Sequence, residues 1–162
     1  MTKLIGEIVE TRLTISHRSS ITAAIEIMAR CQSDRIYLTG DDGRVRGTIP
    51  DYKIIKAYVR GELQTQTLSD LASPLGETLE STQPLLQAAV FFRDSRAVEI
   101  PVFSGDQFLG VVRRTRFLQE LLNVELSEEP QTTSHTPRET SDCLSSAPIL
   151  TGLINLKSRK TG

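Results

Sequence analysis

The chain lacks tryptophan, and aromatic residues make up only 5% of its 162 residues. Few rings are therefore present on which the bases of a single-stranded nucleic acid could stack. The formal net charge is −1, from 19 basic and 20 acidic side chains. The chain thus also lacks the excess of basic residues on which general binding to nucleic acid depends, and we expect no nucleic-acid partner.

Cysteine is scarce as well, and long apolar runs are absent. The two cysteines, Cys31 and Cys143, lie far apart in unlike settings, which indicates neither a disulfide framework nor a metal site. The first residues contain no apolar signal core, and no run approaches the length needed to span a membrane. These absences predict a cytoplasmic protein without a membrane partner and without a metal ion.

Residues arranged for catalysis are missing too. His17 and His135 have no partner at metal-ligand spacing, and no paired carboxylate or cysteine lies near His17 in the sequence. Neither a strand-turn-helix nucleophile motif nor a phosphate-cradling glycine loop is present. We therefore expect that the chain is not an enzyme.

What the sequence does contain is an internal repeat over its first 122 residues. Ile21 corresponds to Leu85, 64 positions later, and Gly47 corresponds to Gly110, 63 positions later. The single lost residue falls where a turn is expected in each copy. A register shared over some sixty positions indicates two copies of one folding unit, and the contact between such copies is a natural place for a ligand.

Each copy predicts the order strand, helix, strand, turn, strand, helix. In the first copy, Ser19 or Ser20 offers an N-cap, and apolar residues then follow at i, i+3, i+4 and i+7. This spacing predicts one apolar helical face made of Ile21, Ala24, Ile25 and Met28. The pair Asp42-Gly43 predicts the hairpin between strands 35–38 and 45–49, because glycine supplies the positive φ that such turns need.

We expect three regions along the chain: a first repeat at 1–62, a second repeat at 63–123 and a tail at 124–162. Ser, Thr, Glu, Gln and Pro dominate residues 127–148, a composition typical of disorder. Apolar residues of 149–156 precede a basic end. This terminus either binds a protein partner or carries incidental apolar residues.

Each copy resembles a cystathionine-β-synthase (CBS) domain, and the pair resembles a Bateman module. The resemblance is carried by features that occur in both copies: lead-in segments 6–9 and 69–72, helices containing Ala24 and Ala88, and strands 47–49 and 110–112; strand 100–102 of the second copy adds to it. It implies an α/β fold, in which two pseudo-symmetric β-α-β-β-α repeats pack as one module. It also implies a homodimer formed through helix faces, here those around Ile54, Tyr58, Phe117 and Leu121.

The resemblance further implies adenosine ligands, such as AMP, ADP, ATP or S-adenosylmethionine, in two clefts between the repeats. The family signature places Ser or Thr after the last strand and an Asp three residues later, whose carboxylate accepts hydrogen bonds from the ribose hydroxyls. This sequence departs from that pattern in both copies. Pro50 and Lys53 stand there in the first copy, and Arg113 and Arg116 in the second.

Two hypotheses follow from these substitutions. In the first, the chain is a stand-alone regulatory protein that senses an adenine nucleotide or another anionic metabolite. Phosphate contacts would come from Arg35, Lys53, Arg113 and Arg116, and the pocket walls from Tyr37, Ile49, Pro50, Val102 and Val112. In the alternative, the clefts have lost nucleotide binding, the basic groups are simply solvated, and the chain is a ligand-free dimerisation and interaction module.

Overall fold

The structure, a computed structural model, describes residues 2–126 of the chain, with side chains up to residue 123. The last helix extends to residue 126, three residues into the predicted tail. The rest of that tail, including the apolar segment 149–156, lies outside the described residues. The predictions of disorder and of a tail-bound partner therefore stay predictions.

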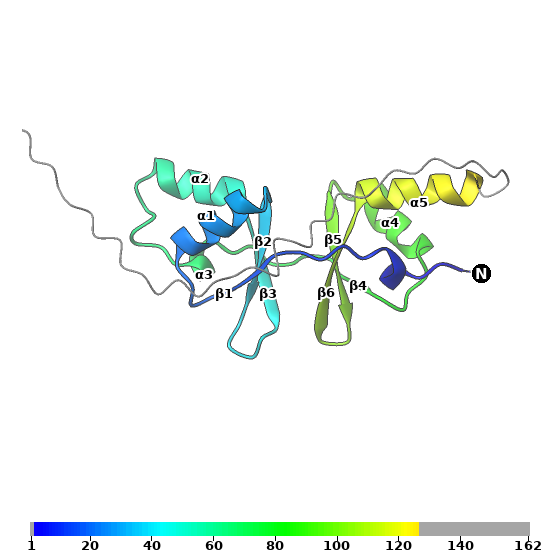
Figure 1. Cartoon of the computed structure of the whole chain (residues 1–162), viewed down its shortest axis with the longest axis horizontal. Coiled ribbons are helices and arrows are strands. Elements are labelled where there is room, and N and C mark those ends of the chain that lie inside the picture. Colours follow the sequence, from blue (N-terminus) through cyan, green and yellow to red (C-terminus); the bar gives the residue numbers. More distant parts are fainter. Residues whose placement is uncertain (1, 127–162) are drawn as a thin grey trace, which may run out of the picture.

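Each repeat contains the five predicted elements in the predicted order (Figure 1). The first repeat is built from β1 (Thr14–Ser16), α1 (Ile21–Arg30), β2 (Arg35–Thr39), β3 (Val45–Pro50) and α2 (Asp51–Val59). The second is built from β4 (Leu79–Glu80), α4 (Leu86–Asp94), β5 (Glu99–Ser104), β6 (Gln107–Arg113) and α5 (Arg114–Leu126). One-turn helices that the sequence analysis did not predict precede the repeats: η1 (Ile5–Ile8) and α3 (Leu68–Leu71).

The strands form two three-stranded sheets with the same topology, β1-β2-β3 and β4-β5-β6. In each sheet the first strand runs parallel to the second, and the second and third form an antiparallel hairpin. Even the irregularity in the hairpin recurs, between Leu38 and Thr39 in one repeat and between Val102 and Phe103 in the other. The α/β class and the pseudo-symmetry predicted from the sequence are thus confirmed.

Helix α1 shows why the local sequence folds as predicted. The Ser20 hydroxyl caps the helix by accepting the backbone N–H three residues later at 3.0 Å. Of its apolar face, Ile21, Ala24 and Met28 are buried. Ile25 lies at the edge of that face and is 37% exposed, where it lines a groove between α1 and α2.

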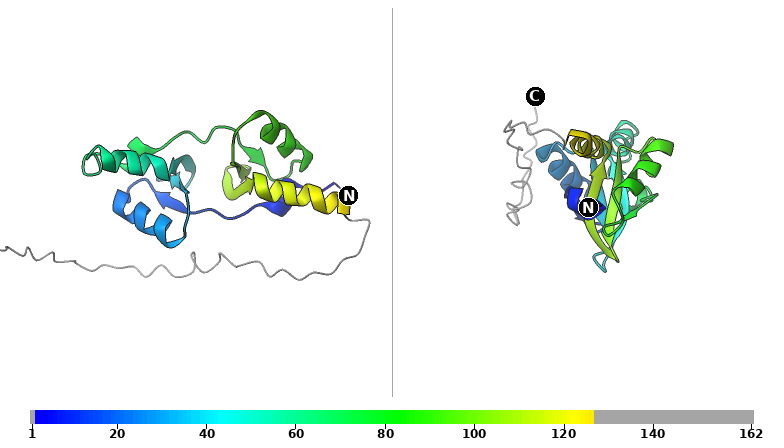
Figure 2. Two further views of the ribbon diagram at one scale, coloured as in Figure 1. Left: turned by 90° about the horizontal axis from the view of Figure 1, so that it is seen from above. Right: turned by 90° about the vertical axis from the view of Figure 1, so that its right-hand side faces the viewer.

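The two one-turn helices are exchanged between the repeats. Ile5 and Ile8 of η1 are buried in the core of the second repeat, whereas Leu68 and Leu71 of α3 are buried in the core of the first. Seen from above, the segments that follow these helices cross between the halves on opposite sides of the pair (Figure 2). Burying each such side chain contributes about 1.5–3 kcal/mol, so the exchange ties the repeats together crosswise.

After its one-turn helix, each lead-in segment pairs with the last strand of the other repeat. Ser73 and Thr48 of β3 exchange two backbone hydrogen bonds, at 2.7 and 2.9 Å. Glu10 and Val111 of β6 do the same, at 2.9 and 2.8 Å. We call the Ser73–Thr48 contact, with the residues around it, the first seam, and the Glu10–Val111 contact the second seam.

Both seams require glycine in the strand. A Cβ added to Gly47 would lie 2.7 Å from the Ser73 carbonyl oxygen, and one added to Gly110 would lie 2.2 Å from that of Glu10. Gly110 also has a φ of +142°, which L side chains rarely adopt. The two glycines that aligned the copies in sequence are therefore the points where one backbone touches another.

A small apolar cluster joins the two sheets between the seams. It contains Tyr37 and Val45 of the first repeat and Val111 of the second, with Phe108 packed against them. The rings of Tyr37 and Phe108 lie 4.9 Å apart between centroids. As a result β2 and β3 stand beside β5 and β6 at the centre, with the helices of each repeat above and outside (Figure 1).

We expect Gly110→Ala to lower the free energy of unfolding by about 3 kcal/mol or more, because the methyl group meets the Glu10 backbone in a strained conformation. Urea denaturation measures the change. The control is Gly43→Ala in the β2–β3 turn, where φ is +73° but nothing lies within 4 Å. The free energy of unfolding of that variant should fall by only about 1 kcal/mol. Equal decreases in the two variants would contradict the conclusion that the close Gly110–Glu10 contact requires glycine.

Candidate functional site

Arg35, Pro50 and Lys53, which the sequence analysis assigned to one cleft, lie on adjoining elements next to the first seam. The β2–β3 register places Arg35 opposite Pro50, and Lys53 follows in the first turn of α2. The Lys53 ammonium donates a hydrogen bond to the Ala72 carbonyl oxygen at 3.4 Å. A side chain of one repeat thus reaches the lead-in segment of the other.

The N-terminus of α2 adds partial positive charge at the same place. Pro50 is the N-cap residue and provides no side-chain cap. The first helical N–H, that of Asp51, donates to the Asp34 carbonyl at 2.9 Å, whereas the N–H groups that follow belong to the turn that α-helices leave without internal partners. Asp51 itself lines the groove between α1 and α2, together with Asp34.

The second seam holds Arg113 and Arg116, but each lies against a carboxylate. Arg113 Nε is 3.0 Å from Glu10 Oε2, an ion pair whose geometry falls short of a hydrogen bond. Arg116 pairs with Glu120 one helical turn later, at 2.9 Å. Arg114, between them, turns away and donates to the carbonyls that end α4, at 2.6 Å to Ser95.

A buried carboxylate that the sequence analysis missed, Glu99, lies between the repeats. Its side chain is only 3% exposed. It accepts a hydrogen bond from the Tyr37 hydroxyl at 2.8 Å and from Arg12 through two nitrogens, with Nε at 3.0 Å. Arg35 approaches the same carboxylate less closely, with Nε at 3.9 Å from Oε1.

A comparison of the two copies could have revealed Glu99. It stands 64 positions after Arg35, at the equivalent place. The second copy thus carries an acidic side chain where the first copy carries a basic one. Its partner Arg12 lies 87 positions away along the chain. No local pattern marks contacts of that range.

The protonation of these groups follows from their surroundings. Burial, and then the charge of Glu99, raises the pKa of the Tyr37 phenol, so this hydroxyl remains a hydrogen-bond donor. At the end of the second seam, the hydrogen bond from Lys3 lowers the pKa of Glu120, and Arg116 adds to the effect. Glu120 is therefore a carboxylate that two cations hold in its charged form.

The predicted wall residues belong to the packed interior. Ile49 lies in the core of the first repeat, and Val102 and Val112 lie in the core of the second, all fully buried. Tyr37 is part of the cluster between the sheets, and Pro50 is buried where β3 ends. These residues fix the backbone at the seams.

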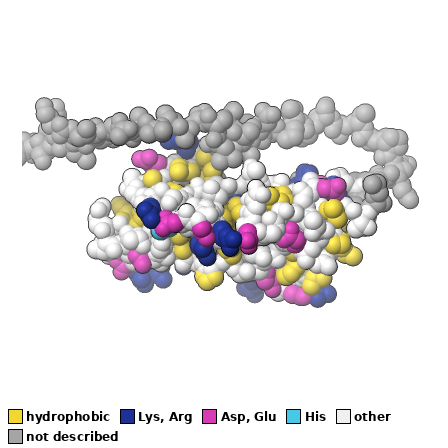
Figure 3. All heavy atoms as spheres, turned by 90° about the horizontal axis from the view of Figure 1, so that it is seen from below, with side chains coloured by type: hydrophobic (Ala, Val, Ile, Leu, Met, Phe, Trp, Pro, Cys, Tyr) yellow, Lys and Arg dark blue, Asp and Glu magenta, His cyan; other side chains and the backbone are white. Residues whose placement is uncertain are grey.

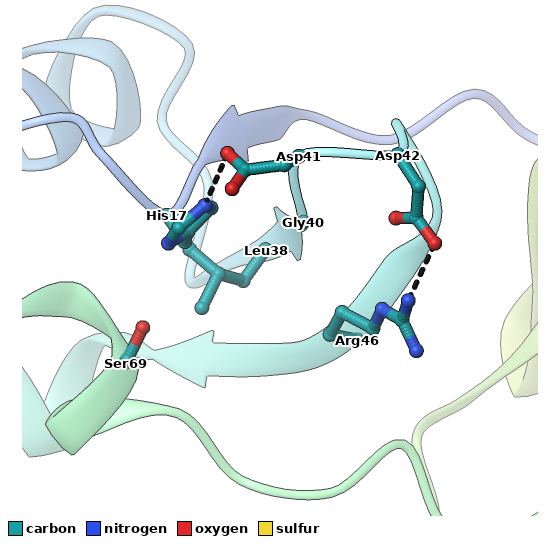
Figure 4. A pocket seen from close by; sticks show the side chains of 7 residues that line it. All are labelled: His17, Leu38, Gly40, Asp41, Asp42, Arg46 and Ser69. Carbon is teal, nitrogen blue, oxygen red and sulfur yellow. Dashed lines mark hydrogen bonds and ion pairs between the residues drawn. The ribbon is translucent and has the colours of Figure 1, made fainter.

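Two cavities lie away from the seams. A polar one of about 460 Å³ is lined by the β2–β3 hairpin, His17 and Ser69 (Figure 4). Its charged groups are paired: His17 Nε2 lies 2.8 Å from Asp41, and Asp42 pairs with Arg46. A more apolar groove of about 430 Å³ runs between α1 and α2.

Seen from the hairpin side, basic and acidic side chains lie next to one another across the surface (Figure 3).

Within residues 2–123, no cluster of three or more His, Cys, Asp or Glu side chains could hold a metal ion. No helix in the described part of the chain is long and apolar enough to cross a membrane.

Comparison with known proteins agrees with this architecture. Residues 5–60 match the CBS domain family model. No curated protein matches the sequence of the chain. Three similar solved structures are OpuCA of Staphylococcus aureus, CBSX2 from Arabidopsis thaliana in complex with AMP, and the CBS domain pair of protein MJ0100 in complex with 5′-methylthioadenosine and S-adenosyl-L-methionine.

The three structures resemble this chain in fold far more than in sequence. Identities are 16, 17 and 17%, and TM-scores are 0.64, 0.62 and 0.62. The alignments cover 73, 75 and 77% of this chain and 98, 98 and 99% of the other chains. Residues 5–60 thus match the CBS domain family in sequence, and the described part of the chain has the fold of a tandem pair of CBS domains.

Proposed function

We propose that this chain is a regulatory CBS-pair module, cytoplasmic and without enzymatic activity, that binds a small anionic metabolite at the first seam. The observation that carries the proposal is the positive charge of Lys53 in the first turn of α2. Lys53 makes no ion pair within the described part of the chain, and its hydrogen-bond acceptor is a neutral carbonyl. Arg35, whose Nε lies 3.9 Å from the nearest Glu99 oxygen, and the N-terminus of α2, which has no side-chain cap, add donors beside it.

Adenine nucleotides are the ligands that we place first. CBSX2 was solved with AMP, and the phosphates of AMP, ADP or ATP match the donors at the first seam. The carboxylate that reads ribose in the family signature is replaced by Lys53, so the phosphate becomes the main point of recognition. S-adenosylmethionine, which is bound by the MJ0100 pair, carries no phosphate and fits this seam less well.

Regulation would follow from the position of the site. A ligand held by Lys53 and Arg35 touches the corner between β3 and α2 of one repeat. It also lies next to Ala72, in the lead-in segment of the other repeat. Binding therefore stabilises one packing of the two repeats over others, by as much as the ligand's affinities for those packings differ.

We expect AMP, ADP or ATP at a hundred times its Kd to stabilise the protein by about 2.7 kcal/mol, several degrees in Tm. Lys53→Glu should abolish the shift, because it places a negative charge against the phosphate. A thermal-shift assay at low salt measures it, with inorganic phosphate and S-adenosylmethionine in parallel. Lys56→Glu, which makes the same charge change at an exposed position of α2, is the control. A shift that persists in Lys53→Glu would contradict the first-seam site.

A second candidate function is supported by the helices. Large apolar side chains of α2 and α5 remain exposed: Tyr52, Ile55, Tyr58, Val59, Leu118, Leu121 and Leu122. Both helices lie on the upper side of the molecule in Figure 1. Of the residues predicted for a dimer face, Ile54 and Phe117 are buried in the cores, but Tyr58 and Leu121 are exposed. Such faces are typical of protein interfaces, and we propose that they form the homodimer.

We expect the protein to be a dimer that the double variant Tyr58→Glu/Leu122→Glu converts to a monomer, because the new charges would be buried in the interface. Size-exclusion chromatography with light scattering gives the mass. The control, Thr65→Glu/Thr82→Glu, adds the same charge at exposed positions outside the helices and should stay dimeric. A monomeric wild-type protein would contradict the proposed interface.

A further inference from the structure

The two seams have the same backbone contacts but opposite charge chemistry. Arg35 at the first seam corresponds to Glu99 at the second, 64 positions later, and Ser73 at the first corresponds to Glu10 at the second, 63 positions earlier. We infer that Glu10 and Glu99 close the second seam to anionic ligands, so that each chain takes a single anionic ligand, at the first seam. This inference rests on the proposed function and defines which half of the pair performs it.

Glu99 occupies the place where a bound anion would meet the basic groups. Its carboxylate is 3% exposed and accepts hydrogen bonds from Arg12, whose side chain is 10% exposed, and from Tyr37. A phosphate that paired with Arg12 would have to displace this carboxylate. The displaced carboxylate would then stay buried without its closest cation, which is unfavourable.

The exposed part of the second seam is neutralised in the same way. Glu10 pairs with Arg113, and both side chains are about 40% exposed, at 36 and 42%. Arg116, at the position of the family's ribose-binding Asp, pairs with the buried Glu120, which also binds Lys3. Each basic residue that the sequence assigned to this seam therefore has an internal carboxylate. At the first seam Arg35 approaches Glu99 only to 3.9 Å, and Lys53 has no carboxylate partner among the described residues.

Ion pairs at the surface alone would not keep an anionic ligand away from the second seam. Exposed pairs in water are weak and exchange readily with dissolved anions. Glu99 and Glu120 differ because both are buried and because two basic side chains hold each of them. The second seam is thus neutralised from within before any ligand arrives.

The test is isothermal titration calorimetry with AMP at low salt. We expect the wild-type protein to bind one AMP per chain, and Arg113→Ala to leave both stoichiometry and affinity unchanged. In Glu10→Gln/Glu99→Gln, the amides keep the shape and the acceptor oxygens but lose the charges. We expect this variant to bind two AMP per chain, and the second site to disappear again when Arg113→Ala is added.

Several results would overturn the inference. The first is the binding of two AMP per chain by the wild-type protein. The second is the loss of AMP binding in Arg113→Ala. The third is a Glu10→Gln/Glu99→Gln variant that folds but gains no second site. If the double variant does not fold, Glu10→Gln alone, at the more exposed carboxylate, must show weak binding that depends on Arg113. A wild-type protein that binds no AMP would refute the proposed nucleotide ligand, whereas the gain or absence of a site in the double variant would still decide this inference.

Discussion

The close contact of backbone with backbone at the two seams is the constraint on which the rest of the structure depends. Gly47 and Gly110 let a lead-in segment lie directly against the last strand of the other repeat. Without that approach, η1 and α3 could not reach the cores that they complete. The same contact sets the positions of Lys53 and Arg113 relative to the opposite lead-in. Packing and the candidate site therefore have a common origin.

On this symmetric frame the side chains make the two seams different. The backbone hydrogen bonds are nearly equal in length at both seams. At the first seam, however, Lys53 has no carboxylate partner among the described residues, whereas the basic residues of the second seam are paired with carboxylates. The difference comes from a few substitutions between the two copies, chiefly Glu99 at the position equivalent to Arg35. The repeat therefore contains two seams with equivalent backbones, and their charged side chains make them chemically different.

The sequence predicted the fold well because the fold is written in local patterns that occur twice. Helical spacing, the turn at Gly43 and the duplicated glycines each mark an element or a boundary, and the agreement of the two copies removes chance matches. The exposure of Ile25 could not be predicted in this way, because periodicity indicates a helical face but not which neighbour covers its edge.

The candidate site was less accessible to prediction. Arg35, Pro50 and Lys53 do lie together, since they share adjoining elements. The counter-charges of Arg12 and Arg113 come from partners far away along the chain, about which residue spacing contains no information. The i,i+4 spacing of Arg116 and Glu120 did allow their ion pair to be expected, but the sequence analysis did not use it. The sequence analysis did not predict the exchange of η1 and α3 either, because each of these helices packs against residues far away along the chain.

That exchange has a consequence for how the chain is made. The core of the second repeat needs Ile5 and Ile8 together with Phe117, which is synthesised more than a hundred residues later. At about 5–20 residues per second, η1 waits roughly 5–20 s for its place in that core. The first repeat can close as soon as Leu71 has left the ribosome. The two repeats therefore cannot fold strictly in chain order, because η1 is buried only after the last helix of the second repeat has begun to form.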